Sequence, residues 1–81
     1  MKTIVFTTQA SKEIDALPLE AKEAVERALN DYAVHRRGDV KKLRGRENDS
    51  RLRVGRYRVI FTESTMTILA IYVGKRDSQT Y

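Results

Sequence analysis

Apolar and polar residues follow two different periods along the chain, and the change of period separates a helical half from a sheet half. A short apolar run within residues 2–7 favours a first β-strand. Between residues 8 and 36 the apolar positions recur at helical spacing. From residue 51 onward, charged and apolar residues alternate with period two, which is typical of half-buried strands. The predicted order of elements is therefore β-α-α-β-β-β.

Two helices are predicted after the first strand. The first covers residues 8–16, and Pro18 separates it from the second, which runs from about residue 18 to residue 36. Each helix carries its apolar residues on one side. These are Ala10, Ile14 and Leu17 in the first helix, and Ala21, Val25, Ala28, Leu29 and Tyr32 in the second.

The remaining segments complete a single α+β domain over residues 1–81. Residues 38–49 are polar and predict a loop, which allows an extended stretch at 41–43. Residues 67–73 form a nearly continuous apolar run, which predicts a central strand with both faces covered, ended by Gly74. The simplest arrangement has two N-terminal helices packed on one face of a small, mainly antiparallel sheet.

A predicted hairpin places several arginines together. Residues 55–56 (Gly-Arg) suit a two-residue type II′ turn, which pairs Val54 with Tyr57 and then Arg53 with Arg58. Because paired residues share a face, the alternation predicts a core side and an opposite side. The core side holds Leu52, Val54, Tyr57, Val59 and Phe61, and the opposite side holds Arg51, Arg53 and Arg58.

Two arginines directly opposite each other suggest an anion site. Like charges at paired positions destabilise a sheet by a few tenths to about 1 kcal/mol. One interpretation is that carboxylates such as Glu47 or Asp49 neutralise the arginines, or that the guanidinium groups spread into water. The other is a prepared phosphate site, because guanidinium groups match phosphate geometry in a bidentate fashion.

Charge distribution favours a polyanion partner. Residues 1–33 carry four basic and six acidic side chains, a net of −2, whereas residues 34–81 carry twelve basic and five acidic, a net of +7. Nucleic acid is the first candidate for such a basic half. The chain has no cysteine and no apolar stretch long enough to span a membrane, and its acidic residues are dispersed. We therefore expect a cytoplasmic protein with no cofactor, metal or membrane partner.

Three segments of the sequence resemble the RelE/ParE toxin superfamily. They are residues 42–45 (KLRG), 51–61 (RLRVGRYRVIF) and 73–76 (VGKR), and the resemblance extends to chain length and to the order of elements. It implies a RelE-like microbial RNase fold and a toxin of a type II toxin–antitoxin system. RelE-like toxins are implied to cut mRNA in the A site of the 70S ribosome, and a cognate antitoxin holds them silent.

The resemblance also implies a catalytic set. Two basic residues on the second strand, an arginine on the third, an arginine after the last strand and a tyrosine near the C-terminus carry the activity in the family. In this chain they fall on Arg51, Arg53, Arg58, Arg76 and Tyr81. The sequence departs from the family in having arginine at both second-strand positions, where lysine is common. Arginine keeps its proton in proteins, so these two residues cannot act as a base.

Metal-free RNA cleavage by attack of the 2′-hydroxyl needs a proton acceptor. The only histidine, His35, lies near the end of a predicted helix with no visible partner. Tyr81 remains, because nearby cations favour a phenolate. Arg58 and Arg76 would then stabilise the charge that develops at phosphorus, and Arg51 and Arg53 would hold flanking phosphates. The general acid stays open.

The other cations of the basic half are candidate RNA contacts or parts of a solvated surface. They are Lys41, Lys42, Arg44, Arg46, Arg56 and Lys75. Tyr72 is predicted to lie on the opposite face of the last strand from Ile71 and Val73, where it would pack under the helices or stack on a base. Two alternatives to the enzyme stay open: a ParE-like inhibitor of DNA gyrase, and a non-catalytic RNA-binding module of the same fold.

Overall fold

A computed structural model of the chain describes residues 2–45 and 48–75. Two helices follow the first strand, and four strands follow the helices. The elements are β1 (Thr3–Phe6), α1 (Thr8–Asp15), α2 (Leu19–His35), β2 (Asp39–Lys42), β3 (Asp49–Val54), β4 (Tyr57–Glu63) and β5 (Thr67–Lys75).

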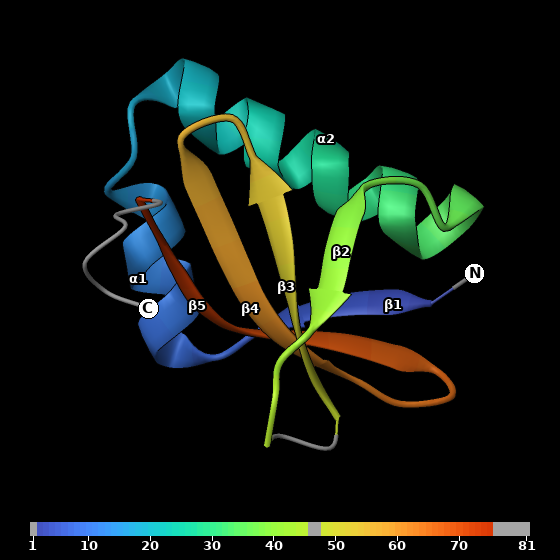
Figure 1. Ribbon diagram of the computed structural model, residues 1–81. Coiled ribbons are helices and arrows are strands. Elements are labelled where there is room, and N and C mark those ends of the chain that lie inside the picture. Colours follow the sequence, from blue (N-terminus) through green and yellow to red (C-terminus); the bar gives the residue numbers. More distant parts are fainter. Residues whose placement is uncertain (1, 46–47, 76–81) are drawn as a thin grey trace.

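The strands form one five-stranded sheet in the order β1-β5-β4-β3-β2. Only the pair β1 and β5 is parallel, because the two helices carry the chain away from β1 before the antiparallel meander of β2 to β5 begins. The two edge strands of the sheet are β1 and β2. Figure 1 shows α1 beside β5. The α+β class and the mainly antiparallel sheet are confirmed.

The residues at the helix ends explain where α1 begins and where α2 begins and ends. The Oγ1 atom of Thr7 accepts a hydrogen bond of 3.0 Å from the backbone N–H of Ala10, and so caps α1. Pro18 separates the two helices, as predicted, and is the N-cap residue of α2, one position before the first turn. Arg36 ends α2 in the left-handed conformation, with φ 57°. Glycine adopts this conformation more easily, but Gly38 lies two residues later.

One core lies between the helices and the sheet. It draws apolar side chains from α1, α2 and the strands β3, β4 and β5, and burial of these side chains is the main source of stability. The largest fully buried side chains are Phe61, Leu29, Leu52, Ile68, Val25 and Val59. A hydrogen bond of 2.9 Å from the backbone N–H of Val73 to Oε1 of Glu13 also ties α1 to β5 beyond the end of β1.

The structure corrects two expectations. The segment predicted as a loop contains β2, which pairs with β3 over four residues from Asp39 to Lys42, so the order is β-α-α-β-β-β-β. The strand β5 lies inside the sheet, between β1 and β4, and continues to Lys75, but only its helix side is fully covered, whereas both faces were predicted to be. Leu69 and Tyr72 lie half-buried on its other side, beside the exposed Val5 of β1.

Glu63 joins three segments at the far end of β4. Its carboxylate accepts hydrogen bonds from Nζ of Lys2 at 2.6 Å, from the hydroxyl of Tyr32 at 2.9 Å and from Nη1 of Arg36. Burial alone would raise the pKa of Glu63, but these donors outweigh it and hold the pKa at about 2, below the ordinary 4.5. Burial, and then the bond to Glu63, raises the pKa of Tyr32.

The depressed pKa of Glu63 predicts a loss of stability in acid. A carboxylate whose folded-state pKa is lowered stabilises the protein above its unfolded pKa of 4.5, and this contribution disappears as pH falls toward about 2. The side chain is 16% exposed, and the contribution is at most about 3 kcal/mol. We expect Glu63→Gln to lower the free energy of unfolding at pH 7 but much less at pH 3. Urea unfolding of both proteins at the two pH values measures this, and an equal loss at both would contradict it.

Candidate nucleic-acid interface

The hairpin of β3 and β4 has the predicted register. Val54 pairs with Tyr57, Arg53 with Arg58, and Leu52 with Val59. Gly55 opens the turn with φ 56°, a value that a residue with a side chain rarely adopts and that the first central position of a type II′ turn requires. The turn therefore fixes which face each arginine occupies.

Arg51, Arg53 and Arg58 lie together on the face of the sheet that the helices leave open. Their neighbours in the same strands, Leu52 and Val59, are fully buried on the helix side. The register of β2 adds Lys41, which pairs with Arg51. We call these four cations the arginine face; they come from three adjacent strands.

The exposure of the arginine face falls from its edge inward. Lys41 and Arg53 are exposed, Arg51 is half-buried, and Arg58 is only 5% exposed. The strand order explains the two extremes, because Arg58 lies on β4, the middle strand of the five, whereas Lys41 lies on the edge strand β2. Arg58 is therefore the most desolvated cation of the group.

Two pairs of like charges lie side by side on this face: Lys41 with Arg51, and Arg53 with Arg58. Asp39 is the carboxylate opposite Arg53 in the neighbouring strand. Within residues 2–45 and 48–75, neither Arg51 nor Arg53 makes an ion pair within 4.0 Å. In the same part of the chain, the buried Nε atom of Arg51 makes no hydrogen bond. The face is therefore positively charged, and its chemistry suits an anionic partner.

Arg58, the least exposed cation, has an apolar residue and an aromatic ring as neighbours on the open face of the sheet. Ile60 is 3% exposed although it lies on the open face, between Arg58 and Thr62 along β4. The residue that pairs with Ile60 on β5 is Tyr72, whose ring centroid lies 5.7 Å from Cζ of Arg58. Tyr72 therefore belongs to the arginine face and does not pack under the helices.

The other predicted contacts are dispersed over the molecule. Arg44 and Arg56 are exposed near turns, and Lys75 is exposed at the end of β5. Lys42 lies on the helix side, in a polar cleft with Lys2 and Glu63, and so does not join Lys41. Arg46, Arg76 and Tyr81 lie outside the described residues, so their predicted roles stay predictions.

Sequence reasoning missed the relation of Lys41 to Arg51 and of Tyr72 to Arg58. The first depends on β2, which pairs Lys41 with Arg51. The second depends on a register shift between β4 and β5, where Ile60 faces Tyr72 but Phe61 faces Ala70. A bulge of this kind has no clear sequence signal in a strand of apolar residues. The only usable signal was the alternation of residues around Tyr72, which predicts the face on which it lies.

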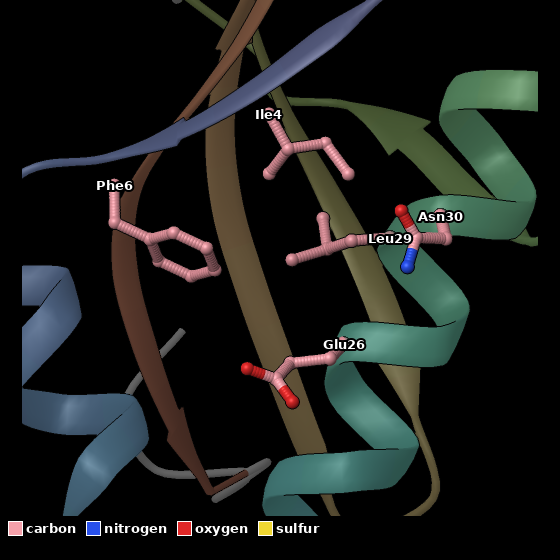
Figure 2. A pocket seen from close by; sticks show the side chains of 5 residues that line it. All are labelled: Ile4, Phe6, Glu26, Leu29 and Asn30. Carbon is pink, nitrogen blue, oxygen red and sulfur yellow. The ribbon is translucent and has the colours of Figure 1, made fainter.

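Away from the arginine face, a groove with both apolar and polar lining residues lies between β1 and α2. Figure 2 shows Ile4 and Phe6 of β1 opposite Leu29 of α2, with Glu26 and Asn30 along the helix. This groove lacks the cations that an RNA phosphate needs. His35 is exposed in the last turn of α2, as predicted.

Metal-binding clusters and membrane-spanning helices are absent from residues 2–45 and 48–75. No group of three or more histidine, cysteine or acidic side chains there could hold a metal ion. None of the helices in the same residues is long and apolar enough to cross a membrane.

Three solved structures illustrate the similarity of this fold to known proteins. A chain of the RelBE2 toxin–antitoxin complex from Mycobacterium tuberculosis is 32% identical, with a TM-score of 0.74 over 93% of this chain and 98% of that one. The isolated RelE toxin from E. coli is 21% identical, with a TM-score of 0.81 over 95% and 86%. A chain of the RelB–RelE complex from Methanococcus jannaschii is 22% identical, with a TM-score of 0.77 over 94% of both chains.

No protein-family model and no curated protein sequence matches the chain. The two likenesses near 20% identity show the fold alone. The likeness to the Mycobacterium tuberculosis chain has a higher identity, and it extends over nearly the whole of both chains. On the strength of that 32% identity, the chain belongs to the RelE-like toxins of type II toxin–antitoxin systems.

Proposed function

We propose that this toxin is a metal-independent endoribonuclease that cuts mRNA in the A site of the ribosome. The observation that carries the proposal is the arginine face, where Lys41, Arg51, Arg53 and Arg58 gather on the side of the sheet that the helices do not cover. A compact group of guanidinium ions suits a substrate that presents successive phosphates. A ribosomal target also implies action in the cytoplasm.

The proposed reaction is an internal transfer at phosphorus. The 2′-oxygen of a ribose attacks the adjacent 3′-phosphate, a 2′,3′-cyclic phosphate forms, and the bond to the 5′-oxygen of the next nucleotide breaks. Tyr81 accepts the proton of the 2′-hydroxyl as its phenolate. Arg58 and Arg76 stabilise the additional negative charge on the phosphorane. The departing 5′-oxygen takes a proton from a donor that we do not assign.

The outer cations have a different task from Arg58. Arg53 and Lys41 are exposed, and we assign them to flanking phosphates, where they would set the register of the RNA. Arg58 is 5% exposed, so the groups that cover its guanidinium must move before a phosphate can reach it. Its desolvated surroundings strengthen its electrostatic effect there, because water screens a charge less in a site of low polarity.

We further propose that a cognate antitoxin covers the arginine face or displaces residues around it. Solved structures with this fold include complexes of RelE with the antitoxin RelB. A partner segment with acidic residues would complement the positive face, and association would be fast and sensitive to salt.

Cleavage on programmed ribosomes tests the proposed function. Ribosomes that hold a defined mRNA with an empty A site are mixed with purified toxin and EDTA, and the 5′ ends of the products are mapped. Cuts within the A-site codon, absent from free mRNA and abolished by the antitoxin, are the expected result. Intact mRNA on ribosomes, together with inhibited DNA supercoiling by gyrase, would contradict the nuclease and favour the ParE-like activity.

A further inference from the structure

Tyr72 and Arg58 are neighbours on the open face of the sheet. The register of β4 and β5 pairs Arg58 with Gly74 and Ile60 with Tyr72. The tyrosine is therefore diagonal to the arginine, a relation that long side chains can bridge. The ring centroid lies 5.7 Å from Cζ of Arg58, within the range of a cation–π interaction.

Gly74 allows the ring of Tyr72 to lie in this position. A Cβ atom added at residue 74 would collide with the hydroxyl of Tyr72, and would lie 2.6 Å from its Cζ atom. The backbone at Gly74 does not adopt the left-handed conformation that would itself require glycine. The absence of a side chain at this position therefore serves the tyrosine, which extends along β5 over Gly74 and toward the partner of that glycine, Arg58.

A second ring–cation pair in the described residues has a different setting. Cζ of Arg36 lies 4.3 Å from the ring centroid of Tyr32, but Arg36 also forms an ion pair with Glu63, which holds it at the end of α2. That pair lies away from the arginine face. Of these two rings, only Tyr72 lies against a cation of the arginine face.

We propose that Tyr72 is a positioning residue for Arg58: its ring holds the guanidinium in the orientation needed at the reacting phosphate. The proposal rests on the proposed nuclease function. A side chain as long as arginine has many rotamers, and fixing them before the reaction removes that cost from the catalytic step. The ring, and not the hydroxyl, performs this role, and Gly74 supports it by leaving room for the phenol.

Three variants separate the ring, the hydroxyl and the space that the ring occupies. Tyr72→Phe keeps the ring, Tyr72→Leu removes it, and Gly74→Ala inserts a methyl group where the phenol lies. In single-turnover cleavage on programmed ribosomes, Tyr72→Phe should retain the wild-type rate within about twofold. Tyr72→Leu and Gly74→Ala should lower the maximal rate roughly 10- to 30-fold. The toxin concentration that gives half of the maximal rate should stay constant, because orientation of Arg58 affects the transition state more than ground-state binding.

A double-mutant cycle tests whether Tyr72 acts through Arg58. If it does, Tyr72→Leu should cause no further loss in the Arg58→Ala background. Independent, multiplicative losses would overturn the proposal. So would an unchanged maximal rate with a raised half-saturating concentration, since that result would mean that the ring contacts RNA directly.

The orientation of Arg58 can also be measured without any RNA. The Nε–H group of Arg58 gives an NMR signal that a nearby ring shifts. We expect this shift in the wild type and in Tyr72→Phe, and expect its loss in Tyr72→Leu and Gly74→Ala. The same shift in all four folded proteins would overturn the proposal, even if the toxin cleaves RNA. If the shift behaves as expected but the wild type does not cleave, the contact stands, while the nuclease and the catalytic role of the contact fail.

Discussion

Arg58→Ala should lower the maximal rate of mRNA cleavage on the ribosome by about 10²–10³, the usual effect of removing one preorganised stabiliser of transition-state charge. Arg58 is the least exposed cation of the arginine face, so water can replace its charge only poorly. Single-turnover cleavage with saturating toxin measures the chemical step free of ribosome turnover. In cells, the same variant should fail to arrest growth at an expression level that is lethal for the wild type.

Two further variants make this result specific. Arg27→Ala removes one positive charge from an exposed site on α2 and should leave the rate unchanged. Arg58→Lys keeps a charge but loses the planar donor group, so it should recover only part of the activity. Because Arg58 is buried, the melting temperature of each variant is measured first. A folded Arg58→Ala protein that cleaves at the wild-type rate would remove Arg58 from the mechanism.

Much of the arginine face could be predicted because a local rule determines it. A two-residue turn at Gly55 and Arg56 sets the register of the hairpin, and the register sets the face of every residue that follows. The buried Leu52 and Val59 then identify which face is the core. The opposition of Arg53 and Arg58 follows from six consecutive residues, without knowledge of the rest of the fold.

The strand β2 could not be predicted in the same way. Its four residues, Asp39–Lys42, include a single apolar side chain, Val40, so they lack the alternation that identifies a half-buried strand. The segment is extended because β3 offers it a row of backbone hydrogen-bond partners. The consequence for the site is direct, since this pairing adds Lys41 to the arginine face and directs Lys42 to the other side of the sheet.

Contacts between residues far apart in the chain also could not be predicted from the sequence. Lys2 and Glu63 are 61 residues apart, and Arg36 and Glu63 are 27 apart, so no local pattern relates them. The same holds for Arg58 and Tyr72, whose proximity depends on the pairing of β4 with β5. Folding is what brings these partners together, and a single sequence carries no signal of it.

Tyr81→Phe should lower the rate of cleavage by about 10²–10⁴, the usual contribution of a positioned general base. Tyr81 lies outside the described residues, and its role is inferred from the family resemblance. His35 is exposed at the end of α2. Since α2 covers the side of the sheet opposite the arginine face, His35 is a poor alternative to Tyr81 as the base. The arginines keep their protons and so cannot serve as the base.

Tyr81→Phe should separate chemistry from binding. The ring remains, and the cations that meet phosphates remain, so affinity for the programmed ribosome should stay within about threefold of the wild type. The Arg53→Ala variant should do the reverse, weakening binding and flattening its salt dependence. Tyr57→Phe is the matched control, because it removes a phenol hydroxyl from a residue that packs against the core. If the wild-type rate rises with pH and the Tyr81→Phe rate does not, the phenolate is the base. Equal rates in both proteins at every pH would exclude Tyr81 from the proton transfer and leave the arginine face to act with a base from the ribosome or the RNA.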